Sequence, residues 1–270
     1  EDVGTYTITP SAAADSNYTV SFVTADFTIT AADLTVTASD QTKVYGATDP
    51  TLTYSITGFQ GTDTEADLDT AVSISRAVGE DVGTYTITPS AAADSNYTVS
   101  FVTADFAITV ADLTVTAIDQ TKVYGATDPS LSYTITGFVN GEDESDLDTA
   151  VSISRAVGED VGTYTITPSA ADSNYTISFV TADFTITQTT LTITGLVGKN
   201  KVYDETTVAT SIGVAALAGV VSNDDVSLGG SPVFTFEVPD PGIFIMITTT
   251  GYTITGSDSG NYILIQPTLY

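Results

Sequence analysis

A thirteen-residue segment, EDVGTYTITPSAA, occurs three times in this chain, starting at Glu1, Glu80 and Glu159, so the copies are spaced by 79 residues. This period is longer than that of most solenoid repeats and close to the size of a small domain. The sequence therefore predicts a tandem array of small domains, each with its own core, rather than one continuous core.

The repeat divides the chain into four parts. Residues 1–31 match residues 80–110 at all but two positions, so they form the C-terminal half of a unit. Full units span 32–110 and 111–189, and the sequence then diverges into a related unit at 190–270. Because the sequence opens in the middle of a unit, we expect it to be a segment of a longer chain.

Within a unit, apolar and polar residues alternate, as in Leu34-Thr-Val36-Thr and Tyr85-Thr-Ile87-Thr. A period of two, rich in β-branched and aromatic residues, is typical of half-buried strands. Gly, Pro and Asp-Ser-Asn turns separate six or seven such runs. The fold class predicted is mainly β, a series of small antiparallel β domains.

One segment in each unit breaks the alternation, at residues 64–70 and again at 143–149. Acidic residues in its first turn and an N-cap at Thr64 or Asp143 predict one short helical turn. This turn leaves two topologies open, a β-sandwich and a β-grasp-like arrangement. No Gly or Pro lies between Phe27 and Val36, so adjoining domains are joined tightly and we expect an elongated, semi-rigid rod.

Composition excludes several classes of function. The formal charge is −28, from 34 acidic and six basic residues, yet 42% of residues are hydrophobic, which indicates folded domains with an acidic surface. Such a surface repels nucleic acid. No histidine or cysteine is present, so Ser/His/Asp and Cys/His centres, most zinc sites and disulfides cannot form. We expect no enzymatic activity, no required cofactor and no membrane insertion of this segment.

Calcium is the one cofactor that stays open. Acidic residues alternate from Asp63 to Asp69, but Leu68 and Ile74 stand where a calcium loop of the EF-hand type needs Gly and Glu. Other acids could converge only through folding, so no metal ligand is assigned. These candidate clusters are Asp49, Glu80 and Asp81 in one unit, and Asp119, Asp128, Glu159 and Asp160 in the next.

Most of the few basic residues recur at equivalent positions in successive units. Each lysine of a Lys-Val-Tyr motif could form an isopeptide crosslink to the asparagine of a later Asn-Tyr motif, or a plain ion pair with a carboxylate. Arg76 and Arg155 predict structural ion pairs. The lysines are Lys43, Lys122 and Lys201, and the asparagines are Asn96, Asn174 and Asn261.

The motifs of the two full units resemble a known family. DQTKVYGATDP at residues 40–50, GEDVGTY at 79–85 and the later Asn96-Tyr97 occur in the order typical of the YGX-type MBG domain. Residues 190–270 resemble the companion YDG domain through KVYD at 201–204 and GNY at 260–262. Departures occur at Glu205, where the name motif has glycine, and at Asp240-Pro-Gly242, where an Asn-Val-Gly turn is typical.

The resemblance implies an extracellular location, since such domains recur in bacterial surface adhesins and filamentous-haemagglutinin-like proteins. It supplies no catalytic or ligand-binding residues. The predicted function is a stalk or spacer that projects a distal binding domain, with neighbouring repeats as partners and host or matrix ligands bound through flanking domains. The alternative is an adhesive module that recognises a glycan, a matrix protein or another copy, with or without calcium. The strand edges of residues 1–31 would pair with another chain or pack on the first repeat.

Overall fold

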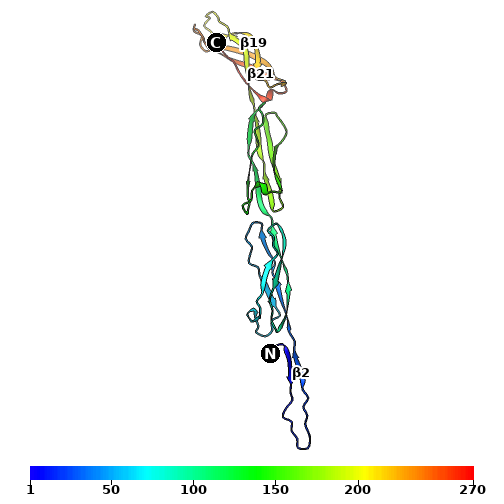
Figure 1. The fold of residues 1–270 in the computed structure, drawn as a ribbon. Coiled ribbons are helices and arrows are strands. Elements are labelled where there is room, and N and C mark those ends of the chain that lie inside the picture. Colours follow the sequence, from blue (N-terminus) through cyan, green and yellow to red (C-terminus); the bar gives the residue numbers. More distant parts are fainter. The chain divides into compact units, whose positions relative to one another are not determined.

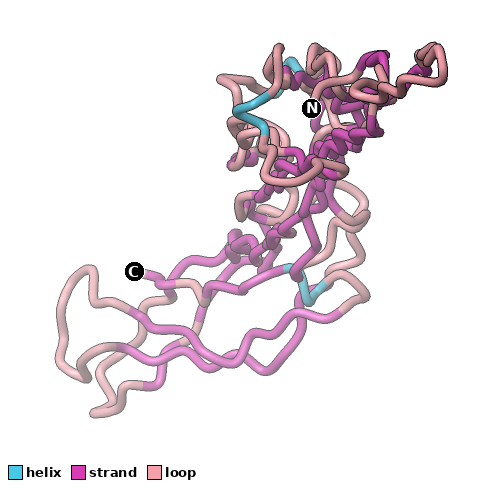
Figure 2. The backbone as a smooth tube through the Cα atoms, turned by 90° about the horizontal axis from the view of Figure 1, so that it is seen from below, coloured by secondary structure: helices cyan, strands magenta, loops and turns pink.

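The computed structural model describes all residues, 1–270, and its regular secondary structure consists almost entirely of strands (Figures 1 and 2). Its helical parts are three single turns of 3-10 helix. No helix is long and apolar enough to cross a membrane. By their internal contacts the residues form two compact units. The first comprises 1–113, 137–149 and 171–177, and the second 114–136, 150–170 and 178–270.

The first unit begins with a two-stranded antiparallel ribbon, β1 (Gly4–Ile8) and β2 (Ala25–Ile29). The first full repeat follows. Its elements are β3 (Ala32–Ala38), β4 (Gln41–Val44), β5 (Tyr54–Thr57), η1 (Glu65–Asp67), β6 (Ser73–Arg76), β7 (Gly83–Ser90), β8 (Tyr97–Val102) and β9 (Ala104–Thr109).

These strands form two sheets, with orders β5-β3-β8 and β4-β9-β7-β6. Alternate residues of both sheets are buried, among them Leu34 and Val36 from one sheet and Ile87 and Phe106 from the other. A two-layer sandwich is therefore the topology. The β-grasp-like alternative is wrong, because the only helical element is the single turn η1, capped at Thr64 as predicted.

The sheets differ from the expectation in one respect, because they are not purely antiparallel. Strand β3 pairs parallel with β8, and β4 pairs parallel with β9. The connections from β3 to β4 and from β8 to β9 are short and each passes from one sheet to the other. Strands β3 and β4 therefore do not pair with each other, and neither do β8 and β9. Each pairs instead with a strand far along the chain, and a distant partner can run parallel.

The second repeat has the same sheet orders, β12-β10-β15 and β11-β16-β14-β13. Its core includes the fully buried Ile166, Phe184 and Ile186, with Ala117 from the facing sheet. The second helical turn is capped at Asp143, as predicted. The elements are β10 (Ala111–Ala117), β11 (Gln120–Val123), β12 (Tyr133–Thr136), η2 (Glu144–Asp146), β13 (Thr149–Arg155), β14 (Gly162–Ala171), β15 (Tyr175–Val180) and β16 (Ala182–Thr187).

The C-terminal domain, which carries β19 and β21 in Figure 1, also has two sheets, β19-β17-β22 and β18-β20-β21-β23. Its Lys-Val-Tyr segment, residues 201–203, is not a strand, although the same motif lies in or beside β4 and β11 of the repeats. The elements are β17 (Thr189–Gly198), β18 (Val208–Ala209), β19 (Ser211–Ala218), β20 (Ser227–Phe236), β21 (Ile247–Thr255), η3 (Ser259–Asn261), β22 (Tyr262–Ile265) and β23 (Thr268–Leu269).

Candidate functional site

Four charged side chains form an ion-pair network in each of the two full repeats. In the first repeat, Lys43 lies between Asp49, 2.7 Å away, and Glu80. Arg76 binds the same two carboxylates, with its Nε 2.5 Å from Asp49. Arg76 and Lys43 together lower the pKa of Asp49 to about 2. Arg76 also donates to the carbonyl of Gly79, so the network fixes the loop that leads into β7.

The second repeat contains the same network, formed by Lys122, Asp128, Arg155 and Glu159. The predicted structural role of both arginines is therefore confirmed. Each arginine also lies over an aromatic ring of the core, with the guanidinium carbon of Arg155 4.6 Å from the centre of the Phe184 ring.

These contacts correct the crosslink hypothesis. Lys43 and Lys122 bind carboxylates, and Lys201 lies 2.7 Å from Asp204. The asparagines of the Asn-Tyr motifs instead bind backbone groups of a preceding segment, as described below. The plain ion pair is thus the arrangement found, because a nearly buried ammonium is stabilised most by ionised partners.

The acidic clusters considered for calcium are also arranged differently. Asp49 and Glu80 do meet, as do Asp128 and Glu159, but Lys and Arg side chains occupy the space between them. The other members lie apart in other hydrogen bonds; Asp119, for example, accepts from the backbone of Asp183. No group of three or more acidic side chains is placed to hold a metal ion.

The first compact unit contains a junction between the first repeat and part of the second. Here Tyr45, which follows β4, and Tyr175, which begins β15, both donate their hydroxyls to the carboxylate of Glu142. Their rings meet edge to face, with centroids 5.5 Å apart and an interplanar angle of 81°. The hydrogen bond to Glu142 and burial raise the pKa of Tyr45 to about 12, and burial with the same bond raises the pKa of Tyr175 to about 12.

An asparagine completes this junction. The Asn174 side-chain oxygen accepts a hydrogen bond of 2.8 Å from the backbone N–H of Val82, and its Nδ2 lies 3.4 Å from the carboxylate of Asp81. Gly46 packs against Val139, and a Cβ at Gly46 would lie 2.4 Å from that side chain. With a φ of 77°, position 46 therefore requires glycine for both its backbone and its contact.

The second compact unit repeats this junction between the second repeat and the C-terminal domain. Tyr124 and Tyr262 both donate to Asp224, and their ring centroids lie 5.4 Å apart. Burial and the hydrogen bond to Asp224 raise the pKa of both hydroxyls. The side-chain oxygen of Asn261 accepts from the backbone N–H of Val161 at 2.8 Å. The same geometry is thus kept although Asp replaces Glu and the surrounding sequence has diverged.

A partial copy of the junction lies at the start of the chain. Asn96 accepts from the backbone N–H of Val3 at 2.8 Å, and Tyr97 donates to Asp63 at 2.6 Å. Residues 1–31 contain no Lys-Val-Tyr motif, so this copy has one tyrosine where the others have two.

Sequence reasoning singled out the Asn-Tyr motif but gave its asparagine the wrong role, and it gave the tyrosines no role in joining domains. Asp63 was considered only for calcium, and Glu142, which precedes the second predicted helical turn, was given no role. A signal was present, because Tyr45 and Tyr124 recur at the repeat spacing, as do the two acids. Recurrence alone does not show that a tyrosine of one unit and an acid of the next share a bond.

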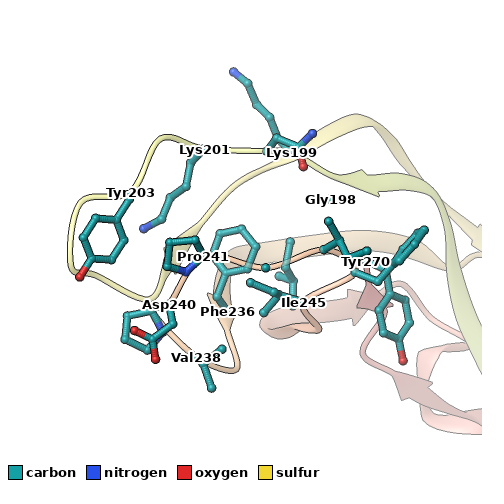
Figure 3. A pocket seen from close by; sticks show the side chains of 16 residues that line it. Gly198, Lys199, Lys201, Tyr203, Phe236, Val238, Asp240, Pro241, Ile245 and Tyr270 are labelled. Atoms are coloured by element: carbon teal, nitrogen blue, oxygen red, sulfur yellow. The ribbon is translucent and has the colours of Figure 1, made fainter.

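The C-terminal domain contains a pocket of about 660 Å³ at the end that carries the Lys-Val-Tyr motif (Figure 3). Its walls come from two segments, residues 198–203 and 236–247, and from Tyr270. Lys201 points across the pocket toward Phe236 and Pro241, whereas the side chain of Lys199 points away from it (Figure 3).

Two family models match the chain, in four segments. The model of the MBG domain (YGX type) matches residues 1–28, 34–107 and 113–185, well over half of the chain. The model of the YDG domain matches residues 187–269. No curated protein matches the sequence.

Proposed function

Because the chain belongs to the family of YGX-type MBG domains, here followed by a YDG domain, we propose that it is a stalk segment of a bacterial surface adhesin. Domains of these two types are typical of surface-associated repeat proteins. In this proposal the repeats act as spacers that hold a distal binding domain away from the cell.

The observation that supports the proposal most directly is that the motif residues of the family form the contacts between domains. The Tyr-Gly pair of one repeat and the Asn-Tyr pair of the next domain meet at both junctions, around one shared carboxylate. The signature residues of the family are therefore used to join domains. A protein whose distinguishing residues make junctions is suited to set the spacing and orientation of successive domains.

The connections between domains support the same role. Only Val110 separates β9 from β10, and only Gln188 separates β16 from β17. A one-residue connection combined with an aromatic pair, a shared carboxylate and a backbone hydrogen bond allows little rotation. We propose that successive domains therefore form an elongated rod, and that lengthening the array lengthens the rod.

The remaining parts of the proposal follow from composition. We propose that the segment is extracellular, has no enzymatic activity, requires no cofactor and does not bind nucleic acid. The net charge of −28 supports the statement on nucleic acid, the absence of histidine and cysteine supports the statement on enzymatic activity, and the domain types support the location. Melting temperatures measured with calcium and with EDTA test the cofactor statement, and a higher value with calcium would contradict it.

Small-angle scattering tests the spacer directly. A variant with one further copy of residues 111–189 inserted after Thr189 is expected to increase the maximum dimension by the length of one repeat. The double variant Tyr45→Ala, Tyr124→Ala is expected to broaden the distance distribution, because both aromatic pairs are lost. Tyr18→Ala, at an exposed tyrosine outside both junctions, is the control. A maximum dimension that does not grow with the added repeat would refute the spacer.

The pocket of the C-terminal domain favours a second candidate, an adhesive module. Aromatic and aliphatic side chains line it together with Lys201 and Asp240, a mixture that suits a glycan or peptide. Binding of the segment to a glycan array and to cells distinguishes the two functions. Saturable binding would show that the segment is more than a spacer.

A further inference from the structure

The turn that carries Glu142 contains the only Asn-Gly pair in the chain, Asn140-Gly141. Residues 139–142 form a tight turn, closed by a hydrogen bond of 3.0 Å from the backbone N–H of Glu142 to the carbonyl of Val139. Asn140 and Gly141 have φ angles of 57° and 80°, and positive φ at both central positions is the mark of a type I′ turn. Asparagine followed by glycine is the pair that adopts this backbone most readily, so the turn itself favours these two residues.

Three residues of this turn take part in the junction between the first and second repeats. Val139 packs against Gly46, and Glu142 accepts the hydrogen bond of the Tyr45 hydroxyl. Asn140 lies close enough to Tyr45 that its amide opposes the rise in pKa that Glu142 and burial cause there. A change in the length or the charge of the turn therefore acts directly on the junction.

The surroundings of the pair leave it open to chemical attack. Asn140 and Gly141 are both exposed to water. Apart from the neighbouring residues of the chain, no atom lies within 4 Å of the place where a Cβ on Gly141 would be. The N–H of Gly141 makes no backbone hydrogen bond. The backbone nitrogen of Gly141 is therefore neither shielded nor engaged, and the side-chain carbonyl carbon of Asn140 is the electrophile nearest to it along the chain.

We propose that Asn140-Gly141 is a site of spontaneous deamidation that weakens this junction with age. The Gly141 nitrogen forms a bond to Cγ of Asn140 and gives up its proton, the bond from Cγ to the amide nitrogen breaks, and ammonia leaves. The product is a five-membered succinimide, which water then opens. Attack at the side-chain carbonyl gives aspartate, and attack at the main-chain carbonyl gives isoaspartate, whose backbone runs through the former side chain. The net change is the addition of one water and the loss of one ammonia.

Both products disturb the contacts of the turn. Either one places a new carboxylate at position 140, two residues from the carboxylate of Glu142, and like charges at short distance repel each other. Isoaspartate also adds one methylene group to the backbone, so the hydrogen bond from Glu142 to Val139 and the two contacts of these residues with the first repeat no longer fit together. The inference goes beyond the spacer function, because it makes one connection of the array change with time.

The equivalent turns of the other two domains lack the labile pair. All three turns end on the acid that binds a tyrosine, and their closing hydrogen bonds measure 3.0 to 3.2 Å. The central positions differ, because Gly61 and Thr62 occupy them in the first repeat, and Ser222 and Asn223 in the C-terminal domain. Asn223 is followed by Asp224, whose side chain crowds the nitrogen that would attack. The proposed reaction is therefore confined to the junction of the first and second repeats.

Mass spectrometry of the full chain during storage in warm, mildly alkaline buffer tests the modification. We expect a gain of about 1 Da, the difference between an amide and a carboxyl group, in the peptide that contains Asn140, with isoaspartate detected there. Asn140→Gln, whose side chain would have to close a six-membered ring, is the matched control and should gain nothing. Asn174, which is followed by a tyrosine, is the internal reference. An unchanged Asn140 after the time in which the urea-unfolded chain is fully converted, or equal conversion at Asn174, would overturn the proposal.

Hydrogen exchange measures the effect on the junction. In the aged protein we expect faster exchange of the N–H of Val82, which donates to Asn174 across the junction, while strand β3 in the core of the first repeat exchanges as before. The variant Asn140→Asp adds the charge without the methylene group and should speed the exchange less. Equal exchange at Val82 in fresh and aged protein, or the same increase in aged Asn140→Gln protein, would overturn the weakening of the junction by this reaction.

Discussion

Residues 1–31 and 80–110 are nearly the same sequence in two different environments. In both, the antiparallel pairing is identical, with Gly4 opposite Ile29 in one and Gly83 opposite Ile108 in the other. Burial differs completely, since Ile87 is fully buried in the full repeat and its equivalent Ile8 is 54% exposed. The segment itself thus specifies the pairing of two strands, whereas the core comes from the other half of the repeat.

The two copies also differ in the region that forms β8 in the full repeat. Residues 97–102 form β8, while the identical residues 18–23 form no strand. Strand β8 pairs with β3, which belongs to the other half of the repeat. A sequence with strong alternation therefore stays irregular when its parallel partner is missing, which shows how strongly β-structure depends on its neighbours.

The largest expected effect is at the core phenylalanine. Phe106→Ala should destabilise the first repeat by about 3–5 kcal/mol, because a fully buried ring is replaced by a cavity. Phe27→Ala, at the equivalent position of the ribbon, should change stability by less than about 0.5 kcal/mol. Hydrogen exchange resolved by segment measures each region separately. Similar losses at both sites would show that the ribbon has a core of its own.

The junction asparagines provide the next comparison. Asn174→Ala leaves the partly buried N–H of Val82 without its acceptor and should cost about 1–3 kcal/mol. Asn96→Ala removes the bond to Val3, which is exposed, so water replaces it and the cost should stay below about 1 kcal/mol. Urea unfolding of the two single variants checks the order, and the reverse order would contradict the assignment of Asn174 to the junction.

The stability of the full repeats should also depend on acid pH in a way that the stability of residues 1–31 does not. The pKa of Asp49 is lowered from 3.8 to about 2 by Arg76 and Lys43, so its ion pairs add stability above the unfolded-state pKa. That contribution should be lost as the pH falls from near 4 through 2. Residues 1–31 contain no base and have no such network. Thermal melts of the full chain between pH 5 and 2 should therefore show a falling melting temperature for the repeats, and Asp49→Asn with Asp128→Asn should flatten the dependence.

The smallest effect is expected at Glu80, whose carboxylate binds both Lys43 and Arg76. Glu80→Gln weakens the contacts with Lys43 and Arg76 and should lower the denaturant midpoint only slightly, because the carboxylate is largely exposed. Glu1→Gln, at the equivalent position of the ribbon, should have no measurable effect. Denaturant midpoints in low and high salt provide the measurement. A loss at Glu80 that is insensitive to salt would speak against an ionic cause.

Much of the fold could be predicted from period and turn chemistry. Alternation located the strands, and the caps at Thr64 and Asp143 located the helical turns. The parallel pairs could not be predicted, because alternation shows which face of a strand is buried and not the direction of its neighbour.

The site was less accessible to sequence reasoning. The fixed places of Lys43 and Arg76 did indicate ion pairs, and these are present. The junctions were missed because Tyr45, Glu142 and Tyr175 are far apart in sequence and meet only after two domains have folded. Nothing local distinguishes a tyrosine that will share a carboxylate across a junction from one that fills a core.

The parallel pairs of the first repeat determine how it responds to tension. The chain enters through Ala32, opposite Tyr97 at one end of β8, and leaves through Thr109, opposite Val44 at the end of β4. A pull on these two residues acts lengthwise along β3 and β9, so the interstrand hydrogen bonds are sheared together and cannot open one after another. We expect single-molecule stretching to give a higher rupture force through Ala32 and Thr109 than across the hairpin of β6 and β7, where the bonds unzip in turn.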